Sequence, residues 1–356
     1  MKILQVLSTF FQGGAEHCAV ELANEIVRQG YECDVVTLFD VEEDNDLIKQ
    51  LNPSVKTFSL HKKLGLDLRC YTKLYRFIRD GKYDVVHAHV GSIPYLLFST
   101  ILLKQVKFVA TIHSEARREA GKSISKWNRF LMFKHGLCTP VTISEESKAS
   151  FDTFYKMNAH MVYNGVSDYQ RSICLNLRDN EDQLLFIHPA SCQPVKNQQL
   201  LFRAFAKLSE EIPNIKLLWL GSKNAYQEMF EELQTIMPQI AQYGGIVPNV
   251  RDYLAEADAM CLSSQMEGMP MTIIEAFSTG CPALCTPVGG IVNMINDGEN
   301  GMLSMDLEVE SYYKMLKSFC NMTADQRKMM REKARNSFSK YSVEKSVKGY
   351  LEIYRS

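Results

Sequence analysis

Several features that would assign this 356-residue chain to other protein classes are missing. None of its ten cysteines forms a Cys-x-x-Cys pair, and Cys281 and Cys285 have no second pair or nearby histidines that would complete a zinc set. The longest uncharged apolar stretch, residues 93–103, is well short of a bilayer span. We therefore expect reduced, mostly buried cysteines and no membrane-spanning helix.

A secretion signal is also missing from the start of the sequence. The run MKILQVLSTFFQGG has one lysine and a short apolar segment, but no small-residue cleavage site follows it. We expect a cytoplasmic protein, at most peripheral at the inner face of a membrane. The 46% hydrophobic and 23% charged composition is that of an ordinary globular protein, and the length favours two domains over one.

Charge is nearly balanced overall, at −1, but it is unevenly distributed. Residues 60–134 contain fifteen Lys and Arg against five Asp and Glu, which gives +10 and leaves −11 for the rest of the chain. Two interpretations remain open: ordinary solvated helix faces, or a surface that attracts anionic lipid headgroups. Nucleic acid is not an expected partner, because no recognised binding motif accompanies the charge.

Strands and helices alternate along both halves of the sequence. Predicted strands at 2–7, 32–38, 85–88 and 108–112 are separated by helical patterns, and strands at 184–188, 216–220, 245–247, 259–262 and 282–285 repeat the arrangement. Alternation of this kind predicts an α/β fold with parallel sheets covered by helices. The polar, irregular segment 166–182 marks a boundary between domains at 1–166 and 167–340.

The stretch SSQMEGMPMTIIEAFSTGCPALCTPVGG, residues 263–290, carries the clearest chemical signal. Glu267 lies in a loop that contains glycine and proline, and Glu275 follows eight positions later in a helical run. A loop that leads into a helix N-terminus favours an anion, and two carboxylates can accept hydrogen bonds from sugar hydroxyls. The alternative is a pair of ordinary surface glutamates.

This stretch resembles the nucleotide-sugar signature of retaining glycosyltransferases, particularly family 4, and the likeness extends over nearly the whole chain. It implies the GT-B fold: two facing Rossmann-like domains with a ligand cleft between them. Residues 1–166 would bind the acceptor and residues 167–340 the nucleotide sugar. The terminal helix, within 341–356, would cross back to the N-terminal domain.

The resemblance also implies roles for residues of the signature. The Glu275 carboxylate would bind the ribose hydroxyls. Glu267, with the backbone of Gly268 and Met269, would contact the transferred sugar. The N–H groups near Met271 and Thr272 would face the phosphates.

Lys196 is the strongest candidate cation. It follows the strand 184–188 at the start of a helix, where a compact positive charge suits a diphosphate leaving group. A salt-bridged surface lysine is the alternative. The sequence departs from the family twice: Ser191 stands where an arginine is usual, five residues before the lysine, and Asn293 stands where a glutamate is common.

Gly13 and Gly14, in Gln-Gly-Gly-Ala-Glu after the first strand, allow close backbone approach to a ligand. They match the Gly-Gly-x-Glu of family 4 and do not form the G-x-G-x-x-G fingerprint of nicotinamide enzymes.

Three histidines, 87, 89 and 113, fall at predicted strand ends. His113 matches a position that helps to place the donor sugar in the family, although each histidine could instead bond a core carbonyl.

Asp44, Asn45 and Asp46 spell the Asp-x-Asp of metal-dependent glycosyltransferases. They lie in a very acidic run, so a solvated loop is the preferred interpretation, and the resembled family needs no metal. We expect no metal and no other cofactor.

These patterns predict a retaining glycosyltransferase that moves a hexose-type sugar from a nucleoside diphosphate sugar, in the first place a UDP-sugar, to a saccharide or lipid-linked saccharide acceptor. A nucleotide-sugar epimerase of the same architecture remains an alternative. A catalytically silent sugar-nucleotide-binding subunit is a second, motivated by Ser191.

Overall fold

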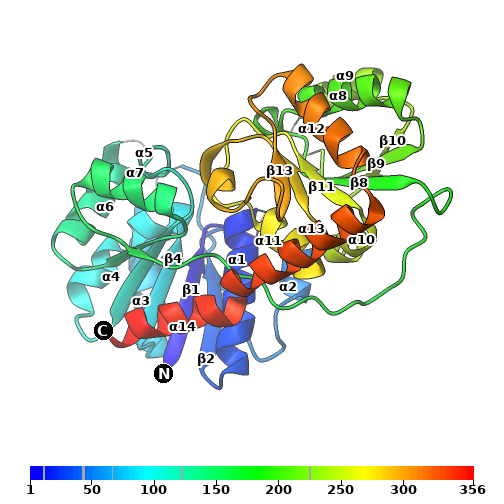
Figure 1. Cartoon of the computed structure of the whole chain (residues 1–356). Helices are drawn as coiled ribbons and strands as arrows, with labels where there is room; N and C mark the ends of the chain where they lie inside the picture. The colour runs from blue at the N-terminus through cyan, green and yellow to red at the C-terminus, as the bar shows by residue number, and fades with distance from the viewer. Residues whose placement is uncertain (11–12, 42–44, 66, 122, 224–225) are drawn as a thin grey trace. The chain divides into compact units, whose positions relative to one another are not determined.

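The computed structural model describes residues 1–10, 13–41, 45–65, 67–121, 123–223 and 226–356. The chain forms two compact units, coloured by residue number in Figure 1. Unit 1 comprises Met1–Ser167 together with Tyr341–Ser356, and unit 2 comprises Asp168–Lys340. Each unit has its own parallel sheet and its own hydrophobic core.

Within its described residues, unit 1 contains a seven-stranded parallel sheet in the order β3-β2-β1-β4-β5-β6-β7. The strands are β1 (Lys2–Leu7), β2 (Glu32–Thr37), β3 (Lys56–Ser59), β4 (Val85–His89), β5 (Lys107–Ile112), β6 (Thr139–Thr142) and β7 (His160–Met161). The central strands β1 and β4 are almost entirely buried, and this burial includes the polar residues Gln5, His87 and His89 as well as their apolar neighbours. The strand order reverses direction between β1 and β4, and this defines the switch point of the sheet.

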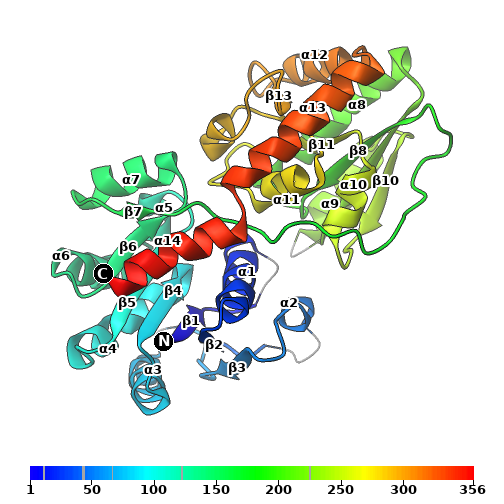
Figure 2. The same cartoon turned by 60° about the horizontal axis from the view of Figure 1, so that its bottom comes forward.

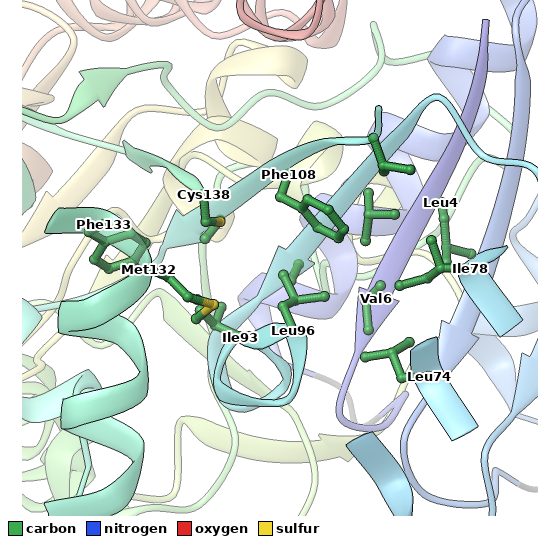
Figure 3. Close-up of a cluster of buried hydrophobic side chains, with 14 of the residues drawn as sticks. Leu4, Val6, Leu74, Ile78, Ile93, Leu96, Phe108, Met132, Phe133 and Cys138 are labelled. Atoms are coloured by element: carbon green, nitrogen blue, oxygen red, sulfur yellow. The ribbon is translucent and has the colours of Figure 1, made fainter. Parts of the chain in front are cut away.

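Helices connect the strands of unit 1. They are α1 (Gly14–Arg28), α2 (Asp46–Lys49), α3 (Leu68–Gly81), η1 (Val90–Leu96), α4 (Leu97–Leu102), α5 (Ala116–Glu119), α6 (Ser123–Lys134), α7 (Glu145–Tyr155) and α14 (Val343–Arg355). Figure 3 shows a cluster of buried hydrophobic side chains, with Leu74 and Ile78 of α3 near Leu4 and Val6 of β1, and Met132 of α6 near Ile93 of η1. This cluster fixes the helices on the sheet and so determines where the loops at the strand ends lie.

The last helix of the chain, α14, belongs to unit 1 and lies beside α1 in Figure 2. Its buried face includes Tyr350 and Tyr354, whose hydroxyls reach polar groups inside the sheet. Tyr354 Oη lies 2.8 Å from His87 Nδ1, and Tyr350 Oη lies 2.9 Å from Thr111 Oγ1. Two tyrosines from the end of the sequence therefore satisfy buried polar side chains of β4 and β5.

Unit 2 has a six-stranded sheet over the residues described there, in the order β10-β9-β8-β11-β12-β13 and parallel throughout. The strands are β8 (Leu184–Pro189), β9 (Ile215–Leu220), β10 (Ala241–Gly245), β11 (Ala259–Leu262), β12 (Ala283–Cys285) and β13 (Gly301–Leu303). Strand β8 lies between β9 and β11. Both neighbours come later in the chain, and they lie on opposite sides of β8 in the sheet. This is the switch point of the second sheet.

The helices of unit 2 are η2 (Pro194–Lys196), α8 (Gln198–Glu211), α9 (Gln227–Ile236), α10 (Val250–Glu256), α11 (Met271–Thr279), η3 (Gly289–Asn293), α12 (Val309–Cys320), α13 (Ala324–Ser337) and η4 (Phe338–Lys340). Trp219 lies at the centre of the core and is 0% exposed. Its indole N–H donates to the carbonyl of Ala190 at 2.7 Å, which anchors the loop after β8.

The expected α/β fold with two parallel sheets is confirmed. The strand predicted at residues 245–247 lies instead at Ala241–Gly245, because β10 is a half-exposed edge strand whose apolar residues do not form a continuous run. All ten cysteines are free, and only Cys174 is exposed. No helix within the described ranges combines the length and the hydropathy that crossing a bilayer requires.

Candidate functional site

The carboxyl ends of β8 and β11 bring two predicted segments of unit 2 together. The loop that follows β8 leads through η2 to Lys196, and the loop that follows β11 contains Glu267. Open α/β sheets bind ligands beside the switch point, outside the carboxyl ends of the strands. Both loops leave the sheet at that place.

Lys196 and Glu267 form an ion pair at this edge. Lys196 Nζ donates to Glu267 Oε1 at 2.7 Å, and the side chains are 23% and 11% exposed respectively. Ser264 Oγ donates to the same carboxylate oxygen at 2.6 Å. The cation predicted to contact phosphate and the carboxylate predicted to contact sugar therefore share one polar cluster.

Backbone contacts hold the two loops in register. The N–H of Gln265 donates to the carbonyl of Val195 at 2.8 Å, and Ser263 Oγ donates to the carbonyl of Lys196 at 2.9 Å. Thr286 Oγ1, after β12, donates to the carbonyl of Ser264 at 2.6 Å. Three successive strand ends thus fix the position of the Lys196 and Glu267 side chains.

Position 290 requires a glycine, because there is no space for a side chain. A Cβ at this position would lie 1.9 Å from the carbonyl oxygen of Gly268, and the Gly290 N–H donates to the carbonyl of Glu267 at 3.3 Å. Contacts this short exclude any larger residue unless the backbone moves. The glycine after β12 therefore allows the Glu267 loop to pack closely.

Helix α11 begins directly after this loop. Its N-cap residue is Pro270, whose side chain makes no capping hydrogen bond, so it leaves first-turn N–H groups of α11 to another acceptor. Met271 is buried and Thr272 is half-buried in that first turn. Glu275 lies in the second turn and is half-buried. The predicted phosphate and ribose contacts thus fall on one short helix behind Glu267.

Ser191 lies in the loop after β8, where its Oγ is 3.3 Å from Ser222 Oγ in the loop after β9. Its carbonyl accepts from Gln198 Nε2 at 3.0 Å. The position of the usual arginine is thus occupied by a short hydroxyl that contacts a second hydroxyl. Asn293, the other departure from the family pattern, is exposed at the end of η3.

His188 belongs to the same strand end and was missed by the sequence analysis. It is 0% exposed, its Nδ1 lies 2.8 Å from the carbonyl oxygen of Cys261, and its Nε2 has no partner among the described residues. Burial lowers its pKa to about 4, so the ring is neutral at pH 7 and Nδ1 carries the proton. The sequence could have indicated His188 by its position at the end of a predicted strand, which it shares with His113.

In unit 1, the two glycines lie at the start of α1. Gly13 is the N-cap residue with extended backbone and no side-chain cap, and Gly14 is the first helical residue. Gln12 lies outside the described residues. The loop after β1 approaches the one after β4, since a Cβ on Gly91 would come within 2.7 Å of Ser8 Oγ. The glycine pair therefore follows a strand at the switch point of this sheet.

His113 follows β5 directly and is half-buried. Its Nε2 lies 2.9 Å from Nδ1 of His89, whose Nε2 lies 2.7 Å from Gln5 Oε1. One ring must donate and the other accept, so the two cannot both be protonated in this contact. Burial lowers the pKa of His113 to about 3. His113 therefore acts as a neutral hydrogen-bonding group at pH 7.

A buried ion pair holds the His113 loop. Glu119 Oε2 accepts from the backbone N–H groups of His113 and Ser114, at 2.8 and 3.2 Å. Glu119 Oε1 pairs with Arg129 Nη1 at 3.2 Å, and both side chains are at least 96% buried, with 4% and 2% exposed. Burial raises the pKa of Glu119 despite the opposing effect of Arg129. Arg129, one of the fifteen basic residues counted in 60–134, is thus a core residue.

The described residues of the Asp-x-Asp sequence, Asn45 and Asp46, stabilise the short helix α2. Asn45 Oδ1 caps α2 by accepting from the N–H of Leu47 at 2.9 Å, and Asp46 pairs with Lys49 at 3.5 Å. Asp44 lies outside the described residues. Over the described ranges, no three His, Cys, Asp or Glu side chains gather as a metal-binding group.

A separate cavity of about 670 Å³ lies at the C-terminal end of α11, opposite to its Glu267 end. Lys328, Arg331 and Arg335 of α13 contribute to its lining. The two arginines are used structurally, because Arg331 donates to the carbonyl of Ala257 at 2.5 Å and Arg335 donates to that of Ser278 at 2.6 Å. We therefore do not assign the donor site to this cavity.

Comparison with known families agrees with this geometry. Residues 12–169 match the model described as Glycosyltransferase Family 4, and residues 176–337 match the one described as Glycosyl transferases group 1. The chain belongs to glycosyltransferase family 4, whose members have the GT-B fold. It is an enzyme that transfers a sugar.

Relatives resemble the chain over most of their length. N-acetyl-alpha-D-glucosaminyl L-malate synthase of Bacillus anthracis is 24% identical, covering 96% of this chain and 93% of the relative. An Escherichia coli UDP-Gal:alpha-D-GlcNAc-diphosphoundecaprenol alpha-1,3-galactosyltransferase is 25% identical, covering 88% and 85%. The crystal structure of Anabaena HepE in complex with UDP has a TM-score of 0.80 at 18% identity and covers 99% of both chains, which is a likeness of fold.

Proposed function

We propose that this protein is a retaining glycosyltransferase that takes its sugar from a UDP-sugar and adds it to a hydroxyl of a saccharide or lipid-linked saccharide. The name of the Escherichia coli relative specifies UDP-Gal and a diphosphoundecaprenol-linked acceptor, and the HepE structure contains UDP. These likenesses support the donor base and the acceptor class. They leave the particular sugar open.

The contact between Lys196 and Glu267 carries the proposal. In the proposed complex, the Lys196 ammonium exchanges its carboxylate partner for the diphosphate of the donor, where it neutralises charge that develops as the sugar leaves. Glu267 then accepts a hydroxyl of the transferred sugar. The 2.7 Å separation supports this assignment, since it places the cation and the carboxylate at one point beside the strand ends, where a single donor could contact both.

The remaining donor contacts are assigned to α11. N–H groups near Met271 and Thr272 would bind phosphate oxygens, because a helix N-terminus favours an anion. The Glu275 carboxylate would accept hydrogen bonds from the ribose hydroxyls. Ser191 and Ser222 would offer hydroxyl donors to the diphosphate in place of the usual arginine, supported by their 3.3 Å separation in adjacent loops.

The proposed reaction retains the anomeric configuration. The bond between the anomeric carbon and the β-phosphate oxygen breaks, and the acceptor oxygen forms its bond on the same face of the sugar. The acceptor proton passes to the departing phosphate, so that no carboxylate nucleophile and no resident metal are required. Neutral His113 is proposed to orient the sugar by a hydrogen bond, consistent with its lowered pKa.

A direct test is incubation with a panel of nucleotide sugars and saccharide acceptors, in the presence of EDTA, with product analysis by NMR. We expect UDP release coupled to a product whose new linkage has the donor's anomeric configuration. An inverted linkage would contradict the mechanism. Conversion of the donor without an acceptor would support the epimerase alternative, and donor binding without turnover would support a silent subunit.

A further inference from the structure

Apolar side chains are exposed on three neighbouring helices of unit 1. Residues that share this exposure come from the segment before α3, from the start of α3, from α4 and from α6: Leu64, Leu68, Phe98, Ile101, Leu102, Ile124, Trp127 and Leu131. We call these eight residues the apolar face. Trp127 is 62% exposed and Phe98 is 51% exposed, which is unusual for side chains of this size.

Helix α6 presents this face in a regular stripe. Ile124, Trp127 and Leu131 follow one another at spacings of three and four residues, which places them on one side of the helix. The opposite side carries buried Met132 and Phe133, which pack in the core of unit 1. Helix α6 is therefore apolar towards the core and apolar again towards solvent.

The three helices form a continuous surface. Tyr71 of α3 connects them: its ring centroid lies 6.1 Å from that of Phe98 on α4, and its hydroxyl accepts from Asn128 Nδ2 of α6 at 2.9 Å. Figures 1 and 2 both show α6, α4 and α3 in succession along unit 1. The exposed apolar residues thus belong to one side of the unit.

Positively charged residues lie on the same elements as the apolar face. Exposed cations accompany the apolar residues on the same elements: Arg69 and Lys73 on α3, Lys104 after α4, and Lys126 and Lys134 on α6. Lys134 lies three residues after Leu131, on the same side of α6 as the apolar stripe. None of these five cations belongs to a salt bridge between described residues, and residues 60–134 as a whole carry +10.

We propose that the apolar face and its cations dock unit 1 on an anionic lipid surface. Interfacial binding uses apolar side chains, often including Trp, which enter the headgroup region, while lysines and arginines contact anionic headgroups. The same features disfavour a second copy of the chain as the occupant, since a symmetric dimer would bring two positive surfaces together. The docking proposal adds a membrane surface as a partner of unit 1. It does not depend on the chemistry of the donor.

Trp127 provides an internal reporter for the docking. The chain has two tryptophans, and the other, Trp219, is fully buried in unit 2. Mixing the full-length protein with phosphatidylglycerol vesicles should shift tryptophan emission to shorter wavelength, and lipids brominated on their acyl chains should quench it. Phosphatidylcholine vesicles should give no shift, and high salt should weaken the response. The Trp127→Phe variant should lose the response.

A pair of variants tests whether the apolar stripe carries the binding. Ile124→Ser with Leu131→Ser removes exposed apolar groups, and Met305→Ser with Met329→Ser is the matched control in unit 2, where both methionines are exposed. In vesicle flotation, we expect the first pair to reduce the bound fraction at least about tenfold, given the loss of apolar area. The control should bind as the unaltered protein does.

Three outcomes would overturn the docking proposal: absence of binding to anionic vesicles, equal binding by both variant pairs, or a concentration-dependent dimer that the Ile124→Ser and Leu131→Ser pair converts to monomer. The last would assign the face to a second copy. A thermal-shift measurement with UDP-sugar separates this test from that of the proposed function, because the Ile124→Ser and Leu131→Ser pair should bind donor normally whether or not it binds lipid.

Discussion

Lys196 Nζ lies 2.7 Å from Glu267 Oε1, so two groups assigned to different parts of the donor neutralise each other in the protein without ligand. This pairing keeps a partly buried cation and a partly buried anion compensated until a substrate replaces the contact. The donor would then supply both the anion for Lys196 and the hydroxyl for Glu267. Under the proposed function, the ion pair would preorganise the site.

The variant Lys196→Ala removes the cation proposed to stabilise the leaving diphosphate. We expect kcat to fall by about 10²–10³-fold, the usual cost of losing one preorganised electrostatic contact. Steady-state kinetics with the preferred UDP-sugar would measure it. The matched control is Lys207→Ala, which removes a lysine of α8 that pairs with exposed Glu310 in the same unit. Equal kcat in the two variants would exclude the assigned role.

The variant Glu275→Gln should weaken donor binding, because an amide oxygen accepts ribose hydrogen bonds less strongly than a carboxylate. We expect a loss of about 2 kcal/mol, or about 30-fold in Kd. Isothermal titration with UDP would measure it. Glu228→Gln, at an exposed position of α9, should leave the affinity unchanged. Unaltered affinity in Glu275→Gln would remove this residue from the donor site.

The variant Glu119→Ala leaves Arg129 buried without its carboxylate partner. Loss of one member of a buried pair typically costs about 3–5 kcal/mol, so the urea midpoint of unit 1 should fall clearly. The double variant Glu119→Ala with Arg129→Met should recover part of that loss, because it removes the uncompensated charge. Asp80→Ala breaks an exposed pair with Arg79 and should have little effect. If Glu119→Ala unfolds at the same midpoint as Asp80→Ala, the buried pair has no stabilising role.

Acidification should destabilise the protein before most carboxylates titrate. Burial lowers the pKa of His87 and of His113 to about 3, below the value of about 6.5 expected in the unfolded chain. Between these values the unfolded state binds more protons, so stability is complete above about pH 6.5 and falls as pH decreases towards about 3. Thermal melts from pH 7 to about pH 5.5 should show a decreasing Tm. A smaller decrease is expected in His113→Gln, and an NMR titration of His113 near pH 6.5 would contradict the argument.

Much of the fold could be predicted because the central strands are short apolar runs between helical patterns. Strands β8 and β11 are of this kind. Strands β3 and β7 were not predictable in the same way: Lys56–Ser59 is largely exposed, and His160–Met161 is a two-residue strand defined only by its pairing with β6. Edge strands depend on a neighbour that local sequence does not specify.

The residues of the candidate site could be proposed from the sequence, but their contacts could not. Lys196 and Glu267 are 71 positions apart, and their pairing follows from the adjacency of β8 and β11 in the sheet. The Glu119 and Arg129 pair was missed because charged residues are usually exposed, and nothing local marks the exceptions. His188 was overlooked although its position at a strand end matches that of His113.

Unit 1 is discontinuous in sequence, since Tyr341–Ser356 completes a structure begun at Met1. During synthesis on the ribosome, residues 168–340 emerge as one uninterrupted segment, whereas residues 1–167 are made well before the helix α14 that packs on them. Until Tyr350 and Tyr354 have been synthesised, Thr111 and His87 lack the hydroxyls that these tyrosines supply. The N-terminal portion of the polypeptide, although made first, therefore gains its full set of native contacts only after the residues of unit 2 have been synthesised.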